Sequence, residues 1–159
     1  MGRFSDGAKV LFPPPLVYVI GLALGIGAGR LLKLPGLGLG SEPELRGLIG
    51  GLAIVAGLVA GFVGAGLFLR WRTAIVPFKP ASHLVTSGIY GWTRNPMYAG
   101  MALSYAGVAV VSNSLAALVL LPLVLATIQG QVIAREEAYL ERAFGGAYVA
   151  YKNRVRRWI

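Results

Sequence analysis

The chain has 159 residues, 56% of them hydrophobic and only 13% charged, with a formal net charge of +9 and no cysteine. Soluble domains carry about 25% charged residues, so this composition excludes an ordinary water-soluble domain. The missing cysteines exclude a disulfide framework and thiolate chemistry. Most basic residues lie between or beyond apolar segments, which favours contact with anionic membrane lipids and argues against a nucleic-acid partner.

Two apolar segments in the first half of the chain are predicted to cross a membrane. The first covers residues 16–32 and follows three prolines, which a first helical turn tolerates because its amides have no intrahelical acceptor. The second covers residues 45–69, after a loop over 33–44 that is rich in glycine and proline. Both approach the roughly 20 residues that span a bilayer core, and we expect the first to be an uncleaved anchor.

Glycines recur at intervals of four in both segments, at Gly21, Gly25 and Gly29 and at Gly57 and Gly61. This spacing lets helix backbones approach closely, either within one chain or in a homo-oligomer. Glycine is also frequent in membrane helices in general. The pattern alone therefore leaves internal packing, oligomer formation and plain composition open.

The second half of the chain predicts a helical hairpin between two polar segments. A connection over residues 70–95 leads to an apolar segment over 96–111, and a polar turn at 112–114 leads to a fourth apolar segment over 115–133. The expected fold is all-α, with about four transmembrane helices and a C-terminal helical segment over 135–159.

The C-terminal tail is charged and aromatic. Leu140, Phe144, Tyr148 and Tyr151 recur at spacings of four, four and three. These spacings predict one apolar stripe of a helix that lies on the membrane or over a pocket. A pair of glycines inside the pattern can break that helix.

Basic residues outside the spans predict the orientation. Four spans place both termini on one side, and an excess of Lys and Arg marks the cytoplasmic side. One side holds Arg3, Lys9, Arg70, Arg72, Lys79, Arg94, Arg135, Arg142, Lys152, Arg154, Arg156 and Arg157, and the other holds Arg30, Lys33 and Arg46. We therefore expect an integral protein of the bacterial inner membrane, with the N- and C-termini, the connection and the tail in the cytoplasm.

The connection ends in residues suited to a charged ligand. Asn95 before Pro96 predicts a helix that begins there, with free amides and the positive end of its dipole. Arg94 can bind a carboxylate through two parallel hydrogen bonds, and Tyr90 and Tyr98 offer aromatic faces to a sulfonium. The same residues are also typical of a membrane border, as a basic anchor, a helix cap and an aromatic belt.

Two glutamates lie where the fourth span is predicted to leave the membrane. Glu136 and Glu137 are costly at that depth unless they are exposed or paired, and a carboxylate there can accept hydrogen bonds from a ribose diol or an amino group. They can equally begin an exposed helix, because acids favour first turns. The chain has no GxGxxG followed by a helix and a ribose-binding acid, which excludes a Rossmann core, and no metal site is predicted.

With these motifs the chain resembles the isoprenylcysteine carboxyl methyltransferase family and its bacterial relatives, which share a domain with phospholipid methyltransferases. The resemblance covers roughly residues 77–159. The pieces that carry it are Leu84-Val85-Thr86-Ser87-Gly88-Ile89-Tyr90, Arg94-Asn95-Pro96-Met97-Tyr98-Ala99-Gly100, and Glu136-Glu137 followed by Leu140, Phe144-Gly145, Tyr148 and Tyr151. The chain departs from the family at Asn95, where histidine is usual, although bacterial members and phospholipid methyltransferases often carry asparagine. Gln129 and Gln131 lie where the eukaryotic enzymes place an arginine suited to a substrate carboxylate.

The resemblance implies one domain over residues 1–159, with N-terminal spans in 1–76 and the cofactor-binding catalytic part in 77–159. It implies an integral-membrane methyltransferase that uses S-adenosylmethionine on a lipid-like or hydrophobic small substrate, by carboxyl O-methylation or amine N-methylation. The implied cofactor-binding residues are Leu84, Gly88, Tyr90, Arg94, Asn95, Tyr98, Glu136 and Tyr148. The predicted catalytic residues are Arg94, which would orient an anion, and Glu137, which would take a proton from an amine.

Two other functions compete with methyl transfer. Membrane sterol reductases resemble the same C-terminal domain but bind a nicotinamide cofactor, and their greater length and extra spans argue against them. A non-catalytic membrane scaffold would explain the packing glycines, but it would not explain the clustering of polar and aromatic residues on one side.

Overall fold

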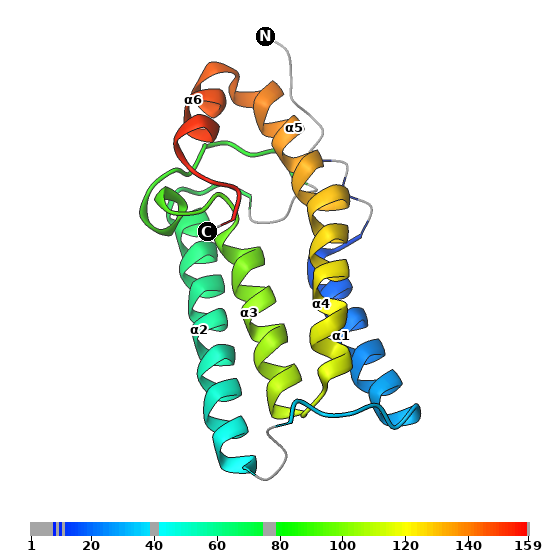
Figure 1. The fold of residues 1–159 in the computed structure, drawn as a ribbon. Coiled ribbons are helices and arrows are strands. Elements are labelled where there is room, and N and C mark those ends of the chain that lie inside the picture. Colours follow the sequence, from blue (N-terminus) through cyan, green and yellow to red (C-terminus); the bar gives the residue numbers. More distant parts are fainter. Residues whose placement is uncertain (1–7, 9, 11, 39–41, 75–78, 159) are drawn as a thin grey trace.

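A computed structural model describes residues 8, 10, 12–38, 42–74 and 79–158. All regular secondary-structure elements within these residues are helices, with one isolated bridge between Thr93 and Arg156, which confirms the all-α prediction (Figure 1). The α-helices are α1 (Pro14–Leu31), α2 (Pro43–Arg70), α3 (Pro96–Val111), α4 (Leu115–Ile128), α5 (Ala134–Phe144) and α6 (Gly146–Arg154). A 3₁₀ turn, η1, covers Gly88–Gly91, and a π-helical turn, η2, covers Gln129–Ile133.

Three helical units are long and apolar enough to cross a membrane. They are α1, α2 and the unit Leu115–Phe144, in which α4, η2 and α5 follow one another without a break. Helix α3 is apolar but has only 16 residues, and at 1.5 Å per residue it is shorter than the roughly 30 Å hydrocarbon core. Three of the predicted spans therefore have helical units of sufficient length and apolarity, and the predicted span over residues 96–111 stays a prediction.

The fourth predicted segment, residues 115–133, and the start of the predicted helical tail lie on one continuous helical unit, which runs to Phe144. No proline or capping residue interrupts the helix where the two meet. The backbone passes from α4 through the π-helical turn η2 into α5, and only the polarity of the side chains changes at Arg135. The helix ends at Gly145, whose φ of +52° glycine adopts without a steric cost. The predicted apolar stripe of the tail is thus divided between α5 and α6.

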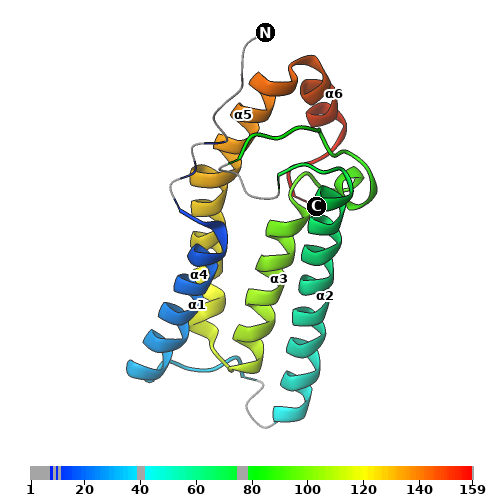
Figure 2. The same ribbon diagram turned by 180° about the vertical axis from the view of Figure 1, so that it is seen from behind.

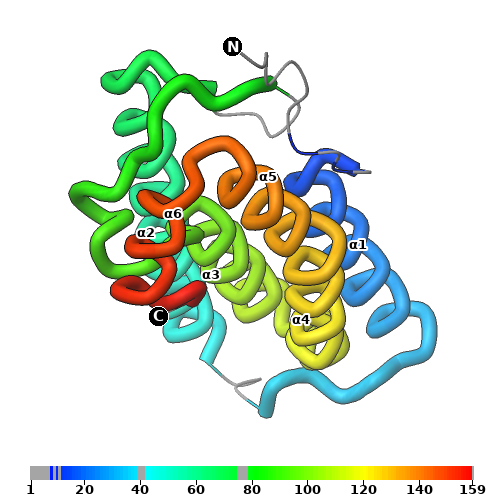
Figure 3. Tube along the Cα trace, turned by 90° about the horizontal axis from the view of Figure 1, so that it is seen from above, coloured from blue at the N-terminus to red at the C-terminus, as the bar shows by residue number. Residues whose placement is uncertain are grey.

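The glycines let the helices pack in pairs, α1 along α4 and α2 along α3 (Figure 3). A Cβ atom at Gly25 would meet Ala117 of α4, and one at Gly57 would meet Ser104 and the Gly100 carbonyl of α3, in each case at less than 3.0 Å. The predicted close packing is therefore internal to the chain at these positions. A Cβ atom at Gly61 would meet nothing within 4 Å among the described residues, and a homo-oligomer stays a prediction.

The outer faces of the helices carry large apolar side chains. Leu24 of α1, Phe62 of α2 and Val119 of α4 are 62%, 74% and 70% exposed. The core lies between the helices and includes Tyr105 and Ile128. Apolar surface of this extent, on helices of this length, fits a lipid environment.

The polar parts of the chain gather at one end of the bundle. Figures 1 and 2 show the connection after α2, the helices α5 and α6, and the C-terminal segment Val155–Trp158 at this end. The turn at 112–114, which joins α3 and α4 in the predicted hairpin, lies at the opposite end. The fold therefore places the two motif-bearing regions beside each other, although more than 40 residues separate Arg94 from Glu136.

The close approach of α2 and α3 predicts a position-dependent response to alanine. Gly57→Ala should lower the thermal midpoint of the detergent-solubilised protein by several degrees, because overpacking costs about 1–3 kcal/mol. Gly51→Ala, in the same helix, meets no atom within 4 Å in the described structure and should leave the midpoint unchanged or raise it, because alanine favours helix. Equal effects of the two substitutions would contradict this packing.

Candidate functional site

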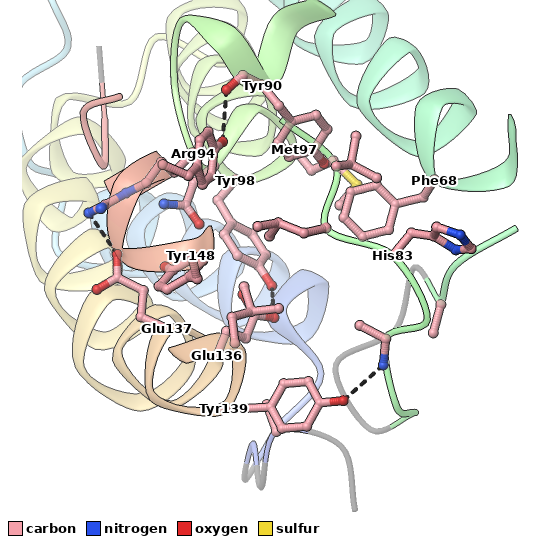
Figure 4. A pocket seen from close by; sticks show the side chains of 18 of the residues that line it. Phe68, His83, Tyr90, Arg94, Met97, Tyr98, Glu136, Glu137, Tyr139 and Tyr148 are labelled. Atoms are coloured by element: carbon pink, nitrogen blue, oxygen red, sulfur yellow. Dashed lines mark hydrogen bonds and ion pairs between the residues drawn. The ribbon is translucent and has the colours of Figure 1, made fainter. Parts of the chain in front are cut away.

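A cleft opens at the polar end of the bundle, between α3, α5, α6 and the connection (Figure 4). About 860 Å³ of empty space lies within it, a volume that includes the open solvent at its mouth. Most of its lining is aromatic or aliphatic. The polar lining residues are Lys79, His83, Tyr90, Arg94, Asn95, Tyr98, Glu136, Glu137, Tyr139, Tyr148 and Tyr151.

Tyr98 and Glu136 form one polar pair inside the cleft. The Tyr98 hydroxyl donates a hydrogen bond of 2.6 Å to Oε1 of Glu136. The backbone of Tyr98 is held in turn by the Tyr18 hydroxyl of α1, which donates to its carbonyl at 3.0 Å. Glu136 has no salt bridge among the described residues. Of the two glutamates that line the cleft, Glu136 is therefore the one whose hydrogen-bond partner is a neutral side chain.

Glu137 lies instead in a cluster with two arginines. Nη2 of Arg94 donates to its Oε1 at 2.9 Å, and Arg157 donates from Nε to Oε1 at 3.0 Å and from Nη2 to Oε2 at 2.6 Å. The side chains of Arg94 and Glu137 are only 9% and 11% exposed. A carboxylate buried to this degree needs such partners, because an unpaired buried charge is strongly unfavourable. The hydrogen bond to Glu137 also raises the pKa of Arg157.

The C-terminal segment Val155–Trp158 holds the start of α3. The Arg94 amide donates to the Arg156 carbonyl at 2.9 Å, and the Asn95 side chain donates to the Arg157 carbonyl at 2.9 Å. The end of the segment is tied to η2, where the Trp158 indole donates to the Gln129 side chain at 2.9 Å. Asn95 occupies the predicted cap position of α3, but its side chain makes no cap hydrogen bond. The predicted start of α3 after Asn95 is confirmed, but the side chain does not cap the helix: its amide nitrogen instead ties the start of α3 to the C-terminal segment.

Tyrosines form the rest of the polar wall. The Tyr151 hydroxyl donates to the Tyr90 carbonyl at 2.7 Å, which holds η1 against α6. Burial raises the pKa of Tyr151 to about 12 and raises the pKa values of Tyr90 and Tyr148 still further above their usual value. All three phenols therefore stay neutral at physiological pH. They offer uncharged aromatic faces to a ligand.

The connection is fixed over the mouth of the cleft. The Tyr139 hydroxyl of α5 accepts a hydrogen bond of 2.9 Å from the Ala81 amide, and the Thr73 hydroxyl accepts from the Ser82 amide at 3.0 Å. His83 lines the cleft beside this loop, is exposed, and its imidazole lies 3.3 Å from the Ser82 hydroxyl.

Most of the predicted site residues come together in the cleft. Gly88 does not line it: its φ of +62° shapes the turn into η1, and a Cβ atom there would meet Leu67 at 3.0 Å. Those that do line it are Leu84, Tyr90, Arg94, Asn95, Tyr98, Glu136, Glu137 and Tyr148. The roles of these residues in binding and catalysis stay predictions.

Other residues of the site were not predicted. Phe68 lies near the end of α2, and its ring centroid is 5.3 Å from that of Tyr90. In the sequence it stands among apolar residues of a predicted span, so nothing there indicated that it would line the cleft. Tyr139 lies one turn beyond Glu136 and could have been found by helical spacing. Arg157 appeared only as one of twelve basic residues, and its pairing with Glu137 carried no signal in the sequence.

Two of the described residues that line the cleft carry a buried polar atom without a hydrogen-bond partner in the described structure. These atoms are the Tyr90 hydroxyl and Nε of Arg94. Buried donors of this kind are usually satisfied by a ligand or water when they lack a protein partner. An adenosyl amino acid suits the lining, since it carries a carboxylate for a guanidinium, a diol for a carboxylate, and apolar and cationic parts for aromatic rings.

Comparison with known proteins identifies one family. The family model for phospholipid methyltransferases matches residues 45–147, which include α2, the connection, α3, α4 and α5. A protein-S-isoprenylcysteine O-methyltransferase of Schizosaccharomyces pombe is 32% identical over 106 residues, which are 60% of this chain and 45% of that protein. The enzyme of the same name from Saccharomyces cerevisiae is 35% identical over 78 residues, 48% of this chain and 33% of that protein.

A shorter relative comes from Haemophilus influenzae. This uncharacterised protein is 51% identical over 49 residues, 31% of this chain and 76% of its own length. No solved structure matches the chain. The chain spans less than half the length of the two yeast relatives that it matches.

The charge cluster predicts that two glutamates of α5 respond differently to the same substitution. Glu137→Gln leaves two guanidiniums facing each other and should cost about 2–3 kcal/mol, somewhat less than a fully buried pair because Arg157 is one third exposed. Glu141→Gln removes an exposed pair with Lys152 and should cost under about 1 kcal/mol. Thermal unfolding in detergent measures both, and a Glu137→Gln protein as stable as Glu141→Gln would contradict the cluster.

Proposed function

We propose a function from one premise: the chain belongs to the phospholipid methyltransferase family. It is an integral membrane protein, with three helical units that can cross the bilayer. We propose that it is an S-adenosylmethionine-dependent methyltransferase that acts on a lipid-like or hydrophobic small acceptor. The observation that carries the proposal is the cleft at one end of the bundle, where Arg94, Glu136 and a wall of tyrosines line one space.

In this proposal different residues of the cleft bind different groups of the cofactor. Arg94 binds its carboxylate, with help from the amides at the start of α3, which no side chain caps. Glu136 accepts from the ribose hydroxyls or the amino group, and Tyr90, Tyr98 and Tyr148 surround the positive sulfur. Leu84 and Asn95 complete the wall. When bound, the cofactor supplies an electrophilic methyl group.

The protein's own contribution is then mainly to position the reacting groups. A carboxylate acceptor needs no base, whereas an amine acceptor must lose a proton. Glu137 is the proton acceptor that the sequence predicts, but guanidinium donors hold both of its oxygens. Glu136 has a phenol as its hydrogen-bond partner, so its geometry favours it as the group that takes the proton.

We propose further that the cleft faces the cytoplasm of a bacterial inner membrane. Among the described residues, the cleft end of the bundle holds ten basic residues, against Arg30, Lys33 and Arg46 at the other end. The ten are Arg70, Arg72, Lys79, Arg94, Arg135, Arg142, Lys152, Arg154, Arg156 and Arg157. This bias supports a cytoplasmic cleft, which a water-soluble cofactor can reach from one side while the acceptor enters from the bilayer.

The competing functions have less support. A membrane reductase would have to bind the three phosphate groups of NADPH, and the described lining of the cleft offers two Lys or Arg side chains for them, Lys79 and Arg94. A scaffold would have no need of a cleft lined by buried polar side chains such as Arg94, Asn95 and Glu137. The methyltransferase names of the two yeast relatives also support methyl transfer.

Calorimetry on the detergent-purified protein tests the proposal. S-adenosylhomocysteine should bind with low-micromolar affinity and NADPH should not bind. Arg94→Ala should weaken the binding of S-adenosylhomocysteine about tenfold or more, because a charge-assisted hydrogen bond is lost. Arg142→Ala removes an exposed arginine of the same end and should have no effect.

The other results each favour a rival function. Binding of NADPH alone would favour a reductase. Binding of neither ligand by a protein whose circular dichroism is fully helical would favour a scaffold.

The two glutamates give a second test once a labelled-methyl screen of membrane lipids has found an acceptor. For an amine acceptor, Glu136→Gln should lower kcat by about 10²–10⁴-fold and change the affinity for S-adenosylhomocysteine by a much smaller factor, because the amide keeps one of the two acceptor oxygens. A loss of turnover in Glu137→Gln but not in Glu136→Gln would instead support Glu137 as the proton acceptor.

A further inference from the structure

The charge cluster at Glu137 contains one more positive group than it needs. Arg157 alone satisfies the carboxylate, because its Nε and Nη2 reach the two oxygens at 3.0 and 2.6 Å. Arg94 reaches only Oε1, at 2.9 Å, and shares that oxygen with Arg157. The paired geometry of Arg157 is the stronger of the two contacts, since two parallel charge-assisted hydrogen bonds fix a guanidinium against a carboxylate.

Arg94 is the arginine that faces the cleft. It belongs to the lining, whereas Arg157 does not. Its side chain is 9% exposed, and its Nε has no partner in the described structure. In Figure 4 its guanidinium meets Glu137 at the border of the cleft. The surplus positive charge of the cluster is therefore buried, incompletely bonded and next to the space for a ligand.

We propose that Arg157 is a positioning residue, which neutralises Glu137 and so leaves Arg94 available for the carboxylate of the adenosyl ligand. The inference rests on the proposed function, because it takes the ligand to be an adenosyl amino acid. With Arg157 absent, Arg94 and Glu137 would form a one-to-one buried pair. Arg94 could then turn to a ligand only by leaving a buried carboxylate without a counter-ion, which is strongly unfavourable.

The backbone of Arg157 allows this charge effect to be separated from a structural one. Its carbonyl accepts hydrogen bonds from the Asn95 side chain and from the Thr93 hydroxyl, at 2.9 and 3.1 Å. These bonds do not depend on the side chain. A substitution at position 157 should therefore keep the C-terminal segment in place while it removes the guanidinium.

The test compares two ligands by calorimetry. S-adenosylhomocysteine carries the carboxylate, and its decarboxylated analogue keeps the adenosine, the sulfur and the amine. Arg157→Met should weaken the binding of S-adenosylhomocysteine about tenfold, the loss expected for one charge-assisted hydrogen bond, and should change the binding of the analogue less than about twofold. Arg156→Met, which removes an exposed neighbour, should change neither.

A double variant provides the rescue. In Glu137→Gln/Arg157→Met the carboxylate that competes for Arg94 is gone, so the affinity for S-adenosylhomocysteine should return to within about threefold of the wild type. Arg157→Lys keeps the charge and should lie between the wild type and Arg157→Met. This variant keeps the test available if the methionine protein is too unstable to purify.

The outcomes separate the inference from the proposed function. If wild-type protein binds S-adenosylhomocysteine but the position 157 variants weaken both ligands equally, Arg157 has only a structural role and the inference is wrong, while the proposed function stands. Equal affinity of the wild type for the two ligands would also overturn the inference, because the carboxylate would then not be recognised. If the wild type binds neither ligand, the proposed function fails and the inference fails with it.

Discussion

A carboxylate buried at the end of a membrane helix must have a counter-ion, and at Glu137 this requirement joins three distant parts of the chain. Glu137 comes from α5, Arg94 from the connection before α3, and Arg157 from the C-terminal segment. The same segment also accepts hydrogen bonds from the start of α3. The charge cluster and these backbone contacts together fix the distance between α3 and α5, and the cleft lies between these helices.

The sequence predicts the helices well wherever a local backbone signal exists. Helices α1, α2 and α3 begin at Pro14, Pro43 and Pro96, because proline fixes φ at a value that suits the first turn of a helix. Helix α5 ends before Gly145, because glycine can adopt the positive φ that terminates a helix. The predicted boundary of the fourth segment at residue 133 rested on a change of polarity alone. Polarity decides which solvent surrounds a helix but does not end it, so α5 continues the line of α4.

The candidate site is predictable in its residues but not in its contacts. The motifs around Arg94 and Glu136 mark the side chains that line the cleft. Spacing along the chain, however, could not show that Glu137 would pair with Arg157, 20 residues away, or that Asn95 would bond to a carbonyl instead of capping its helix. These pairings depend on which groups the tertiary fold brings close together. Here tertiary contacts override the local preference of Asn95 to cap its helix.

The most direct test of the account is to locate the cofactor on the chain. Ultraviolet light can couple radiolabelled S-adenosylmethionine to aromatic side chains that touch it, and mass spectrometry of the digested protein then identifies the labelled peptide. The account predicts label on Tyr90, Tyr98 or Tyr148, removed by excess S-adenosylhomocysteine and not by NADPH. Label confined to Tyr18, Tyr105 or the tryptophans outside the cleft, or label that S-adenosylhomocysteine does not displace, would contradict it.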